Sequence, residues 1–275
     1  MILITGHRGF LGSHLMKALG SRAIGLDRKS EPVATSDNRV TVASVSPSAD
    51  ETLTFPQKCG TFSEWTSRLA ALDRSFAIKT VVHAGAISDN LYKDFDIFQW
   101  NVYATNILLE MFCWDAHFIY ISSQTANDPK TLYGHTKKMS ELLIQQQALM
   151  DACIFQPFNI YGEDESMKPA HCQSLPHRLK KGNLEVLWDT CRDYIHVEDC
   201  VAAIKKAIES RTTGTYHLGT GIGTHSHALA ERFDFGERWT YEERPPHIEY
   251  GNLADPEKFL SDWEPKQKID DYCKS

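Results

Sequence analysis

The first twenty residues, Met1 to Gly20, constrain the fold of this chain more than any other stretch. Ile2 to Ile4 form a short apolar run that predicts a strand buried on both faces. A turn with regularly spaced glycines follows, and apolar residues then recur at helical spacing until Gly20. A strand, a glycine turn and a helix in this order are typical of a dinucleotide-binding element, in which the helix N-terminus faces the phosphates.

Each glycine of the turn has its own expected task. Gly6 permits the tight turn, Gly9 lets the backbone approach a pyrophosphate, and Gly12 lets the helix pack on the strand. Asp27 follows the apolar run 23–26, at the distance expected for a carboxylate that binds a ribose hydroxyl. A glycine triad alone is weak support, but strand, helix and carboxylate are all present here. We therefore predict a bound dinucleotide rather than an ordinary strand-turn-helix.

Bulk composition excludes several other classes of protein. A net charge of −7 opposes nucleic acid as a partner, because phosphate binding needs a basic face. No run reaches the length of a membrane span, and the first strand starts directly after Met1, so we expect no membrane segment, no signal peptide and a cytoplasmic protein. The seven cysteines are odd in number and contain no C-x-x-C pair, which predicts reduced thiols and no metal site.

Strand and helix patterns alternate along the first part of the chain. The polar stretch 28–50 predicts a loop with a short strand around 40–45. Further strands are expected over 80–86, 118–121 and 152–155, and helices over 62–72, 101–112 and from Tyr133 onward. This alternation predicts an α/β fold with a doubly wound parallel sheet covered on both faces. Beyond Gly162 the pattern loosens, with helices expected over 175–181, 198–209 and 225–233 and a strand over 215–218.

Tyr133 and Lys137 stand four residues apart at the start of a predicted helix, so their side chains share one face. An ammonium near a phenol stabilises the phenolate and lowers the tyrosine pKa, which would make Tyr133 a base near neutral pH. Ser123 ends the preceding predicted strand and can hydrogen-bond the same substrate oxygen. Together with the glycine turn, these three residues predict the removal of a proton from a substrate hydroxyl.

With these motifs in place, the chain resembles the extended short-chain dehydrogenases/reductases, within the NAD-dependent epimerase/dehydratase family that acts on nucleotide sugars. The motifs occur in family order: T-G-x-x-G-x-x-G at 5–12, V-V-H-A-G-A at 81–86, N-V-Y-A-T-N-I-L-L-E at 101–110, Y-x-x-x-K at 133–137, P-F-N-I-Y-G at 157–162, R-D-Y-I-H-V-E-D at 192–199, L-G-T-G at 218–221 and A-D with W-x-P at 254–265. The resemblance implies a Rossmann-type domain over 1–161, with 192–218 packing back on it. A smaller substrate-binding subdomain would comprise 162–191 and 219–275.

The resemblance also implies roles for individual residues. Tyr133 would be the catalytic base, Lys137 would hold the nicotinamide ribose and tune Tyr133, and Ser123 would orient the sugar hydroxyl. Asn159 and Arg192 would bind the nucleotide diphosphate, with Arg244 a weaker candidate for the same task. The implied cofactor contacts are Gly6, Arg8, Gly9, Phe10, Leu11, Gly12, Asp27, Arg28, Ala84, Gly85, Ala86, Asn101 (which braces the site through the backbone), Tyr133, Lys137 and Pro157.

Within the family the subgroup is less sharply defined. Gln124-Thr125 stands where 4,6-dehydratases need an Asp-Glu pair, which disfavours dehydration. The reductases that make GDP-fucose carry a cysteine in place of Gln124, yet they share the G-H-R-G turn at 6–9. The ADP-heptose 6-epimerases carry a lysine seven residues after the tyrosine of F-N-x-Y-G as a second acid/base, and Lys168 stands at that spacing. We favour an epimerase, with a keto-sugar reductase and an inactive cofactor-binding regulator as alternatives.

The identity of the cofactor and the oligomeric state are expected on similar grounds. Asp27 repels a 2′-phosphate and favours NAD, whereas Arg8 and Arg28 could hold NADP, and we favour NAD. Relatives commonly pair through helices equivalent to 101–114 and 134–149, which implies a homodimer. The chain departs from the family in its short segment between Ser123 and Tyr133 and in His217, which replaces a common asparagine. It also has no clear equivalent of the aspartate that usually follows the third strand and contacts adenine.

Overall fold

A six-stranded parallel sheet forms the larger part of the molecule. The computed structural model describes residues 1–27, 61–112, 114–147, 151–182, 186–233, 240–244 and 251–274. The strand order is β2-β1-β3-β4-β5-β9. The strands are β1 (Ile2–Thr5), β2 (Ala23–Leu26), β3 (Thr80–His83), β4 (His117–Ile121), β5 (Ala152–Pro157) and β9 (Gly214–Leu218). The order reverses between β1 and β3, and in such sheets ligands bind beyond the carboxyl ends of the strands at that point.

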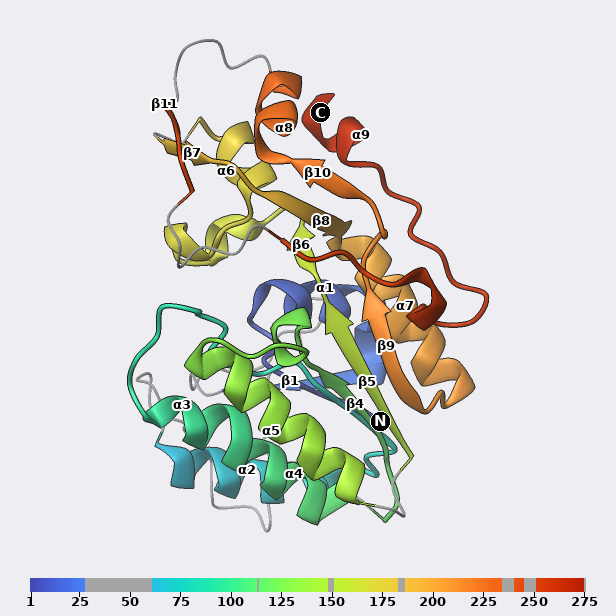
Figure 1. Cartoon of the computed structure of the whole chain (residues 1–275). Coiled ribbons are helices and arrows are strands. Elements are labelled where there is room, and N and C mark those ends of the chain that lie inside the picture. Colours follow the sequence, from blue (N-terminus) through green and yellow to red (C-terminus); the bar gives the residue numbers. More distant parts are fainter. Residues whose placement is uncertain are drawn as a thin grey trace.

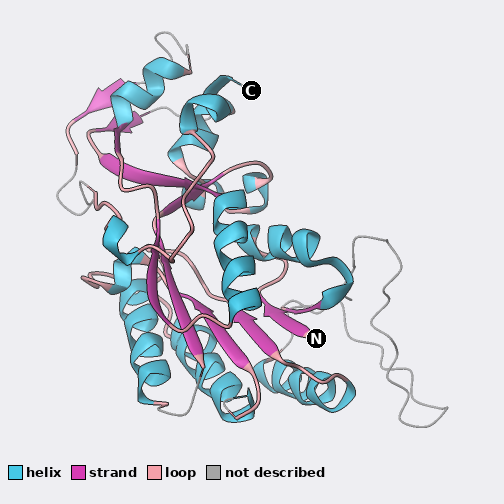
Figure 2. Cartoon of the chain, turned by 90° about the vertical axis from the view of Figure 1, so that its right-hand side faces the viewer, coloured by secondary structure: helices cyan, strands magenta, loops and turns pink. Residues whose placement is uncertain are grey.

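Helices cover both faces of this sheet, as Figure 2 shows. Because successive side chains of a strand point to opposite faces, Ile2 and Ile4 enter one core and Leu3 enters the other. The first core is closed by α1 (Phe10–Leu19) and α7 (Val197–Ser210). The second core is closed by α2 (Phe62–Ser75), α4 (Ala104–Phe112) and α5 (Leu132–Gln146). The predicted α/β fold with a doubly wound sheet is confirmed.

A smaller three-stranded sheet lies beyond the carboxyl ends of the large one (Figure 1). It has the order β10-β8-β6, from β6 (Asn159–Tyr161), β8 (Cys191–His196) and β10 (Gly223–His225). A two-stranded sheet pairs β7 (Val186–Trp188) with β11 (Thr240–Glu242). The helices of this lobe are α6 (Leu175–Lys180), α8 (Ser226–Arg232) and α9 (Ile269–Lys274). Their apolar faces share a separate core that includes Tyr161, Leu179, Leu229 and Tyr272.

The longer predicted elements are present, and the differences concern short ones. The strand expected over 80–86 ends at His83, so 84–86 continue as irregular backbone. The helix expected from Asn101 starts earlier, with α3 (Asp96–Phe98) and a π-helical turn, Gln99–Tyr103, that leads into α4. The strand expected around 40–45 lies outside the described residues. Among the helices of the described ranges, none combines the length and the apolar character needed to cross a bilayer.

Candidate active site

The glycine turn joins β1 to α1 by backbone contacts that leave no room for side chains. Gly6 has φ +69°, and its N–H donates to the carbonyl of Leu26 at 2.8 Å. A Cβ on Gly6 would lie 2.5 Å from the Cα of Gly85, so the turn touches the segment after β3 backbone to backbone. A Cβ on Gly12 would overlap the carbonyl oxygen of Gly6. Gly6 and Gly12 therefore have no space for a side chain, because the backbone of the turn packs directly on other backbone at both positions.

The third glycine of the turn, Gly9, has more space around it than Gly6 and Gly12. Within the described part of the chain, and apart from the neighbours of Gly9 in sequence, only the carbonyl oxygen of Gly6 would lie within 4 Å of a Cβ added to Gly9, at 3.2 Å. Gly9 is the N-cap of α1 and supplies no side-chain hydrogen bond to the helix. The first-turn N–H groups of α1 are thus not capped by a Gly9 side chain, and a helix N-terminus of this kind suits an anion such as a pyrophosphate. The cradle fits the dinucleotide predicted from the sequence.

This geometry predicts different effects for two matched substitutions. We expect Gly12→Ala to lower the melting temperature, because the new methyl group would displace α1 from the turn. We expect Gly9→Ala to keep the melting temperature within about 2 °C but to weaken dinucleotide binding about tenfold or more, because its methyl group would stand where the backbone must approach the phosphates. Thermal unfolding and calorimetric titration with NAD would test both. Equal effects of the two variants on stability would contradict this division of tasks.

A neutral histidine and a carboxylate lie beside the turn. The ring of His7 lies directly on Gly25 of β2, where a Cβ would overlap it. Burial lowers the pKa of His7, so its ring is neutral at neutral pH and adds no positive charge here, although Asp27 acts in the opposite direction. The backbone N–H of Arg8 donates to Asp27 Oδ2 at 3.3 Å, which places this carboxylate at the end of β2. Arg28 lies outside the described residues.

A directed hydrogen-bond chain connects the first and third strands to the helix layer. His83 Nδ1 accepts a hydrogen bond from Thr5 Oγ1 (2.6 Å), and its Nε2 donates one to Thr105 Oγ1 (3.0 Å). These roles follow because Thr105 Oγ1 donates onward to the Asn101 carbonyl at 2.7 Å, while Thr5 Oγ1 accepts from the Gly85 N–H at 3.3 Å. The chain therefore fixes Gly85, one of the residues expected to contact the cofactor, through neutral His83.

His83 makes stability depend on pH with a definite sign. Burial, with a smaller contribution from Lys137, lowers the pKa of His83 to about 3. Since the unfolded ring titrates near pH 6.5, the unfolded chain takes up this proton first, so stability is complete above about pH 6.5 and falls toward pH 3. Compared with His83→Gln, the wild type should lose an additional ~1.4 kcal/mol per pH unit below pH 6. Urea unfolding between pH 7.5 and 4.5 measures the difference, and parallel pH profiles would refute it.

Asn101 lies in the π-helical turn and joins two parts of the expected site. Its Oδ1 accepts from the Ile87 N–H at 2.7 Å, and its Nδ2 donates to the Ile87 carbonyl at 3.1 Å. Nδ2 also donates to Thr136 Oγ1 at 3.0 Å, one residue before Lys137. A π-helical turn widens the helix at one point and often occurs at functional sites. Here it points the buried amide of Asn101 at the backbone that follows β3 and at α5.

The structure brings Ser123, Tyr133 and Lys137 together at the carboxyl end of β4. Ser123 is the last residue before a short 3-10 turn, and its hydroxyl accepts from Thr125 Oγ1 at 3.0 Å. It also lies close enough to Tyr133 to lower the pKa of that phenol. The ammonium of Lys137 donates to the Ile121 carbonyl at 2.7 Å and lies 5.8 Å from the centre of the Tyr133 ring. The three side chains therefore converge from β4 and the first turns of α5.

The pKa values of this group differ from the expectation that Lys137 lowers the pKa of Tyr133. Burial raises the pKa of Tyr133 to about 12, and the hydrogen bond with Ser123 offsets only part of that rise. Burial also lowers the pKa of Lys137 to about 7, with Glu141 acting in the opposite direction. The physical reason is that both side chains lose water, while the ammonium points at a backbone carbonyl. Tyr133 is therefore a phenol at neutral pH in the chain alone.

Glu141 follows Lys137 by one helical turn and is almost completely buried. Its Oε1 accepts from Ser122 Oγ at 2.6 Å and from Gln156 Nε2 at 2.8 Å, so one carboxylate joins α5 to the ends of β4 and β5. It also opposes the effect of burial on the charge of Lys137. The sequence analysis did not single out this residue, although its spacing from Lys137 places it on the same helix face.

Asn159 and Arg192 meet across neighbouring strands of the small sheet. Arg192 Nη1 donates to Asn159 Oδ1 at 3.3 Å, and Asn159 Nδ2 donates to the Asp193 carbonyl at 2.8 Å. Both side chains are half-buried, and Asn159 begins β6 two residues after β5 ends at Pro157. The two residues expected to bind the diphosphate thus form one polar unit. Arg244 lies two residues after β11 and is also half-buried.

Lys168 has a different environment from the one its expected role suggests. Its ammonium forms a 2.9 Å ion pair with Glu165 Oε2, and it lies 4.1 Å above the ring of Phe10, the first residue of α1. Glu165 is fully buried and also accepts from the Ser174 N–H (2.8 Å) and hydroxyl (2.6 Å). Lys168 is therefore held at the start of α1, beside the glycine turn.

Together, the sheet order, the glycine turn and the converging side chains define a Rossmann-type dinucleotide-binding protein. The chain belongs to the NAD dependent epimerase/dehydratase family, whose model matches residues 2–219. The fold is similar to that of the ADP-L-glycero-D-manno-heptose-6-epimerase of Helicobacter pylori, with a TM-score of 0.76 and 19% identity over 99% of this chain and 93% of that one.

Two further solved structures share the fold at similar distance. The dTDP-glucose 4,6-dehydratase of Bacillus anthracis, in complex with NAD, has a TM-score of 0.75 and 16% identity over 99% of this chain and 95% of that one. The UDP-glucose 4-epimerase of Stenotrophomonas maltophila, with bound NAD and a formylated UDP-arabinopyranose, has a TM-score of 0.75 and 21% identity over the same shares. The family is therefore one of NAD-dependent enzymes of the sugar-nucleotide type, and it includes both epimerases and dehydratases.

Proposed function

We propose that this protein is an NAD-dependent epimerase of a nucleotide-activated sugar. The observation that supports this most is the convergence of Ser123, Tyr133 and Lys137 at the carboxyl end of β4. The same sheet carries the glycine turn after β1, where a Cβ on Gly6 or Gly12 would overlap backbone atoms. Such a set can remove a proton from a sugar hydroxyl while a cofactor beside it accepts a hydride. The relatives that bind NAD and nucleotide sugars support the same reaction class.

Each residue has a proposed part in the reaction. NAD, held by the glycine turn and Asp27, would supply the hydride acceptor. Tyr133 removes the proton from the substrate hydroxyl, and Ser123, whose hydroxyl acts on the pKa of Tyr133, orients that hydroxyl. Lys137 binds the nicotinamide ribose and provides positive charge for the phenolate. Because the pKa of Tyr133 is about 12 in the chain alone, this charge must act when the ternary complex forms.

The smaller lobe would bind the substrate. We propose that 162–191 and 219–275 form this subdomain and that Arg192 and Asn159 bind the diphosphate, with Arg244 as a weaker candidate. Lys168 is the proposed second acid/base on the basis of the resemblance alone. Its ammonium is held toward the buried carboxylate of Glu165 by a 2.9 Å ion pair, and for this reason we rank it below Tyr133.

The neutral pair Gln124-Thr125 supports epimerisation over dehydration. Gln124 Oε1 accepts from Asn252 Nδ2 at 3.0 Å, so the side chain after Ser123 is an amide held by the C-terminal tail. An amide cannot donate the proton that a leaving hydroxyl needs for loss of water. In the dehydratases a carboxyl group at this position donates it.

A screen of nucleotide sugars would test the proposed function. Ligands that bind the native state raise its melting temperature, so a thermal-shift panel of UDP-, GDP-, ADP- and dTDP-sugars identifies the nucleotide. Each binder is then incubated with the protein and NAD. We expect the sugar epimer to form without net change in absorbance at the NADH band. Stoichiometric oxidation of NADPH with a keto-sugar nucleotide would instead establish the reductase, and NAD binding without turnover of any sugar would favour the regulator.

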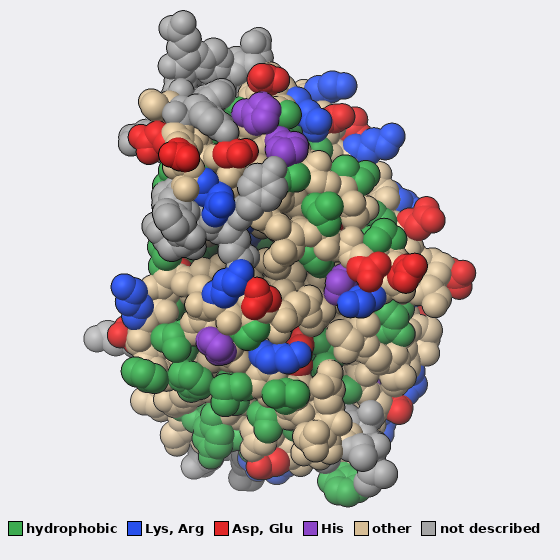
Figure 3. Space-filling model, viewed as in Figure 1, with side chains coloured by type: hydrophobic (Ala, Val, Ile, Leu, Met, Phe, Trp, Pro, Cys, Tyr) green, Lys and Arg blue, Asp and Glu red, His purple; other side chains and the backbone are tan. Residues whose placement is uncertain are grey.

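We also propose a homodimer formed through α4 and α5. Figure 3 shows hydrophobic side chains gathered over the helical face in the lower half of the molecule. Met139 and Leu142 of α5, and Tyr103 directly before α4, are among the large apolar residues that are exposed. Light scattering should give twice the mass of one chain, and Leu142→Glu should return the mass to that of a monomer. A wild type that is monomeric at micromolar concentration would refute the dimer.

A further inference from the structure

A group of potential metal ligands forms where the loop after β3 meets the smaller lobe. Asp89 lies in the loop after β3, and His171 and Cys172 lie in a short 3-10 turn of the smaller lobe. Their ligand atoms all lie within 4.8 Å of one another, although Asp89 is separated by more than eighty residues from the other two. Figure 1 shows the loop after β3 rising toward the segment that contains this turn.

The three side chains are held in place by their own segments. Asp89 Oδ1 accepts from the Leu91 N–H at 2.8 Å, which leaves Oδ2 directed at His171 Nε2 at 2.9 Å. The N–H of Cys172 donates to the Pro169 carbonyl at 2.8 Å. On the same segment, buried Glu165 fixes the backbone of Ser174. Asp89 and Cys172 are partly buried, whereas His171 is exposed.

We propose that Asp89, His171 and Cys172 form a site for a divalent transition metal ion, with Zn²⁺ as the expected occupant, that links the two lobes. A thiolate, an imidazole and a carboxylate are the ligand types that Zn²⁺ binds, whereas Mg²⁺ and Ca²⁺ favour oxygen ligands. Bond lengths of about 2.0 to 2.3 Å in a tetrahedral site place ligand atoms roughly 3.3 to 3.7 Å apart. The ligand atoms lie within 4.8 Å of one another, and Asp89 Oδ2 and His171 Nε2, at 2.9 Å, must move slightly apart to admit the ion.

Zn²⁺ can bind only where ligand atoms give up their protons, and each of these protons has a place to go. Zn²⁺ replaces the Nε2 proton through which His171 contacts Asp89 Oδ2. A singly protonated ring carries that proton on Nδ1 instead, and a doubly protonated ring releases it to solvent and keeps the proton on Nδ1. The Cys172 thiol releases its proton to solvent as the sulfur binds the metal, and water completes the fourth position. None of the three ligands belongs to the residues proposed to act on substrate or cofactor, but the charge of Lys168 reaches the thiol of Cys172.

A second group of possible ligands provides an internal comparison. Asp189, His225 and His227 also lie within 4.8 Å of one another, but both histidines are exposed and there is no sulfur ligand. Metal binding at these histidines must be removed before the first site is measured. The double variant His225→Ala/His227→Ala therefore serves as the parent protein for every titration.

The experiment uses Co²⁺ and Zn²⁺ on this full-length parent after treatment with a chelator. We expect one Co²⁺ per chain to produce the near-ultraviolet absorption of a cobalt–thiolate bond, and Zn²⁺ to displace it. Cys172→Ser should abolish that absorption, and Cys172→Ser, His171→Ala and Asp89→Asn should each weaken Zn²⁺ binding about tenfold or more in competition with a chromophoric chelator. The matched control is Cys191→Ser, which changes another partly buried cysteine and should leave both signals intact.

The results that would overturn the site are equally definite. Absorption that survives Cys172→Ser, or Zn²⁺ affinity that is the same in all variants, would show that other residues bind the metal. Circular dichroism of each variant checks that the fold is retained, which we expect because the three side chains lie at the surface of their segments. Zn²⁺ should also slow amide exchange in both 88–95 and 163–174, and protection of only one segment would contradict a link between the lobes.

Discussion

Tyr133→Phe should lower turnover of the nucleotide sugar by about 10²- to 10⁴-fold, the range that a positioned acid/base contributes. The variant loses only the phenolic oxygen, while the ring keeps its packing and its position near Lys137. We therefore expect the affinity for NAD to change less than about threefold. Initial rates with the sugar identified by thermal shift, and calorimetric titration with NAD, would measure the two effects separately.

Tyr103→Phe is the matched control for this experiment. Tyr103 lies on the π-helical turn with an exposed side chain, so loss of its hydroxyl should leave turnover unchanged. A Tyr133→Phe variant with full activity would remove the mechanism that we propose, whereas the family and the fold would stand. A variant that loses NAD affinity as well as turnover would show that the phenol mainly holds the cofactor.

The cofactor side of the site could be predicted from the sequence because it depends on local pattern. Gly6, Gly9 and Gly12 act within one turn, and their spacing specifies the backbone geometry that the structure shows. The pair Tyr133 and Lys137 is likewise local, since four residues on a helix bring two side chains to one face. The direction of the Tyr133 pKa could not be predicted in this way. It depends on burial and on the Ile121 carbonyl that holds Lys137, both of which arise from tertiary packing.

The smaller lobe was harder to predict for a related reason. Its short strands β6, β7, β10 and β11 have three residues each, too few to show a period. Two fully buried carboxylates, Glu165 and Asp193, organise it, and their partners are mainly backbone N–H groups from other segments. A backbone N–H group is present in every residue except proline, so the sequence does not reveal which residues will donate to these carboxylates. Both acids therefore look like ordinary polar residues of a loop and a strand in the sequence.

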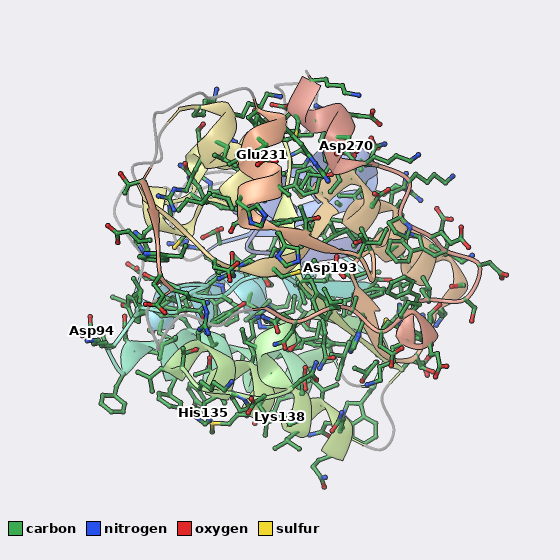
Figure 4. All side chains as sticks on the ribbon, turned by 45° about the horizontal axis from the view of Figure 1, so that its top comes forward. Asp94, His135, Lys138, Asp193, Glu231 and Asp270 are labelled. Carbon is green, nitrogen blue, oxygen red and sulfur yellow. The ribbon has the colours of Figure 1, made fainter. Side chains whose placement is uncertain are left out.

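Asp193→Ala should destabilise the protein by about 3 kcal/mol or more. Asp193 lies near the middle of the molecule in Figure 4, on β8 beside Arg192, and it is fully buried. Its Oδ1 accepts from the N–H (2.8 Å) and the hydroxyl (2.7 Å) of Thr220, and its Oδ2 accepts from the N–H groups of Gly221 (2.8 Å) and Ala254 (3.0 Å). The alanine variant leaves three backbone donors without an acceptor, and each such loss costs roughly 1 to 3 kcal/mol.

Two comparisons separate this effect from the loss of a negative charge. Asp193→Asn keeps an acceptor toward Thr220 but turns an NH₂ group toward two N–H donors, so its stability should fall between wild type and alanine. Asp270→Ala removes an exposed acid of α9, also labelled in Figure 4, whose ion pair with Arg232 contributes at most about 1 kcal/mol. Urea unfolding at pH 7.5 ranks the three variants. Equal stability of Asp193→Ala and Asp270→Ala would contradict this prediction. It would mean that Asp193 does not join β8 to the 219–221 turn and the C-terminal tail. Other contacts would then have to hold Arg192 in position.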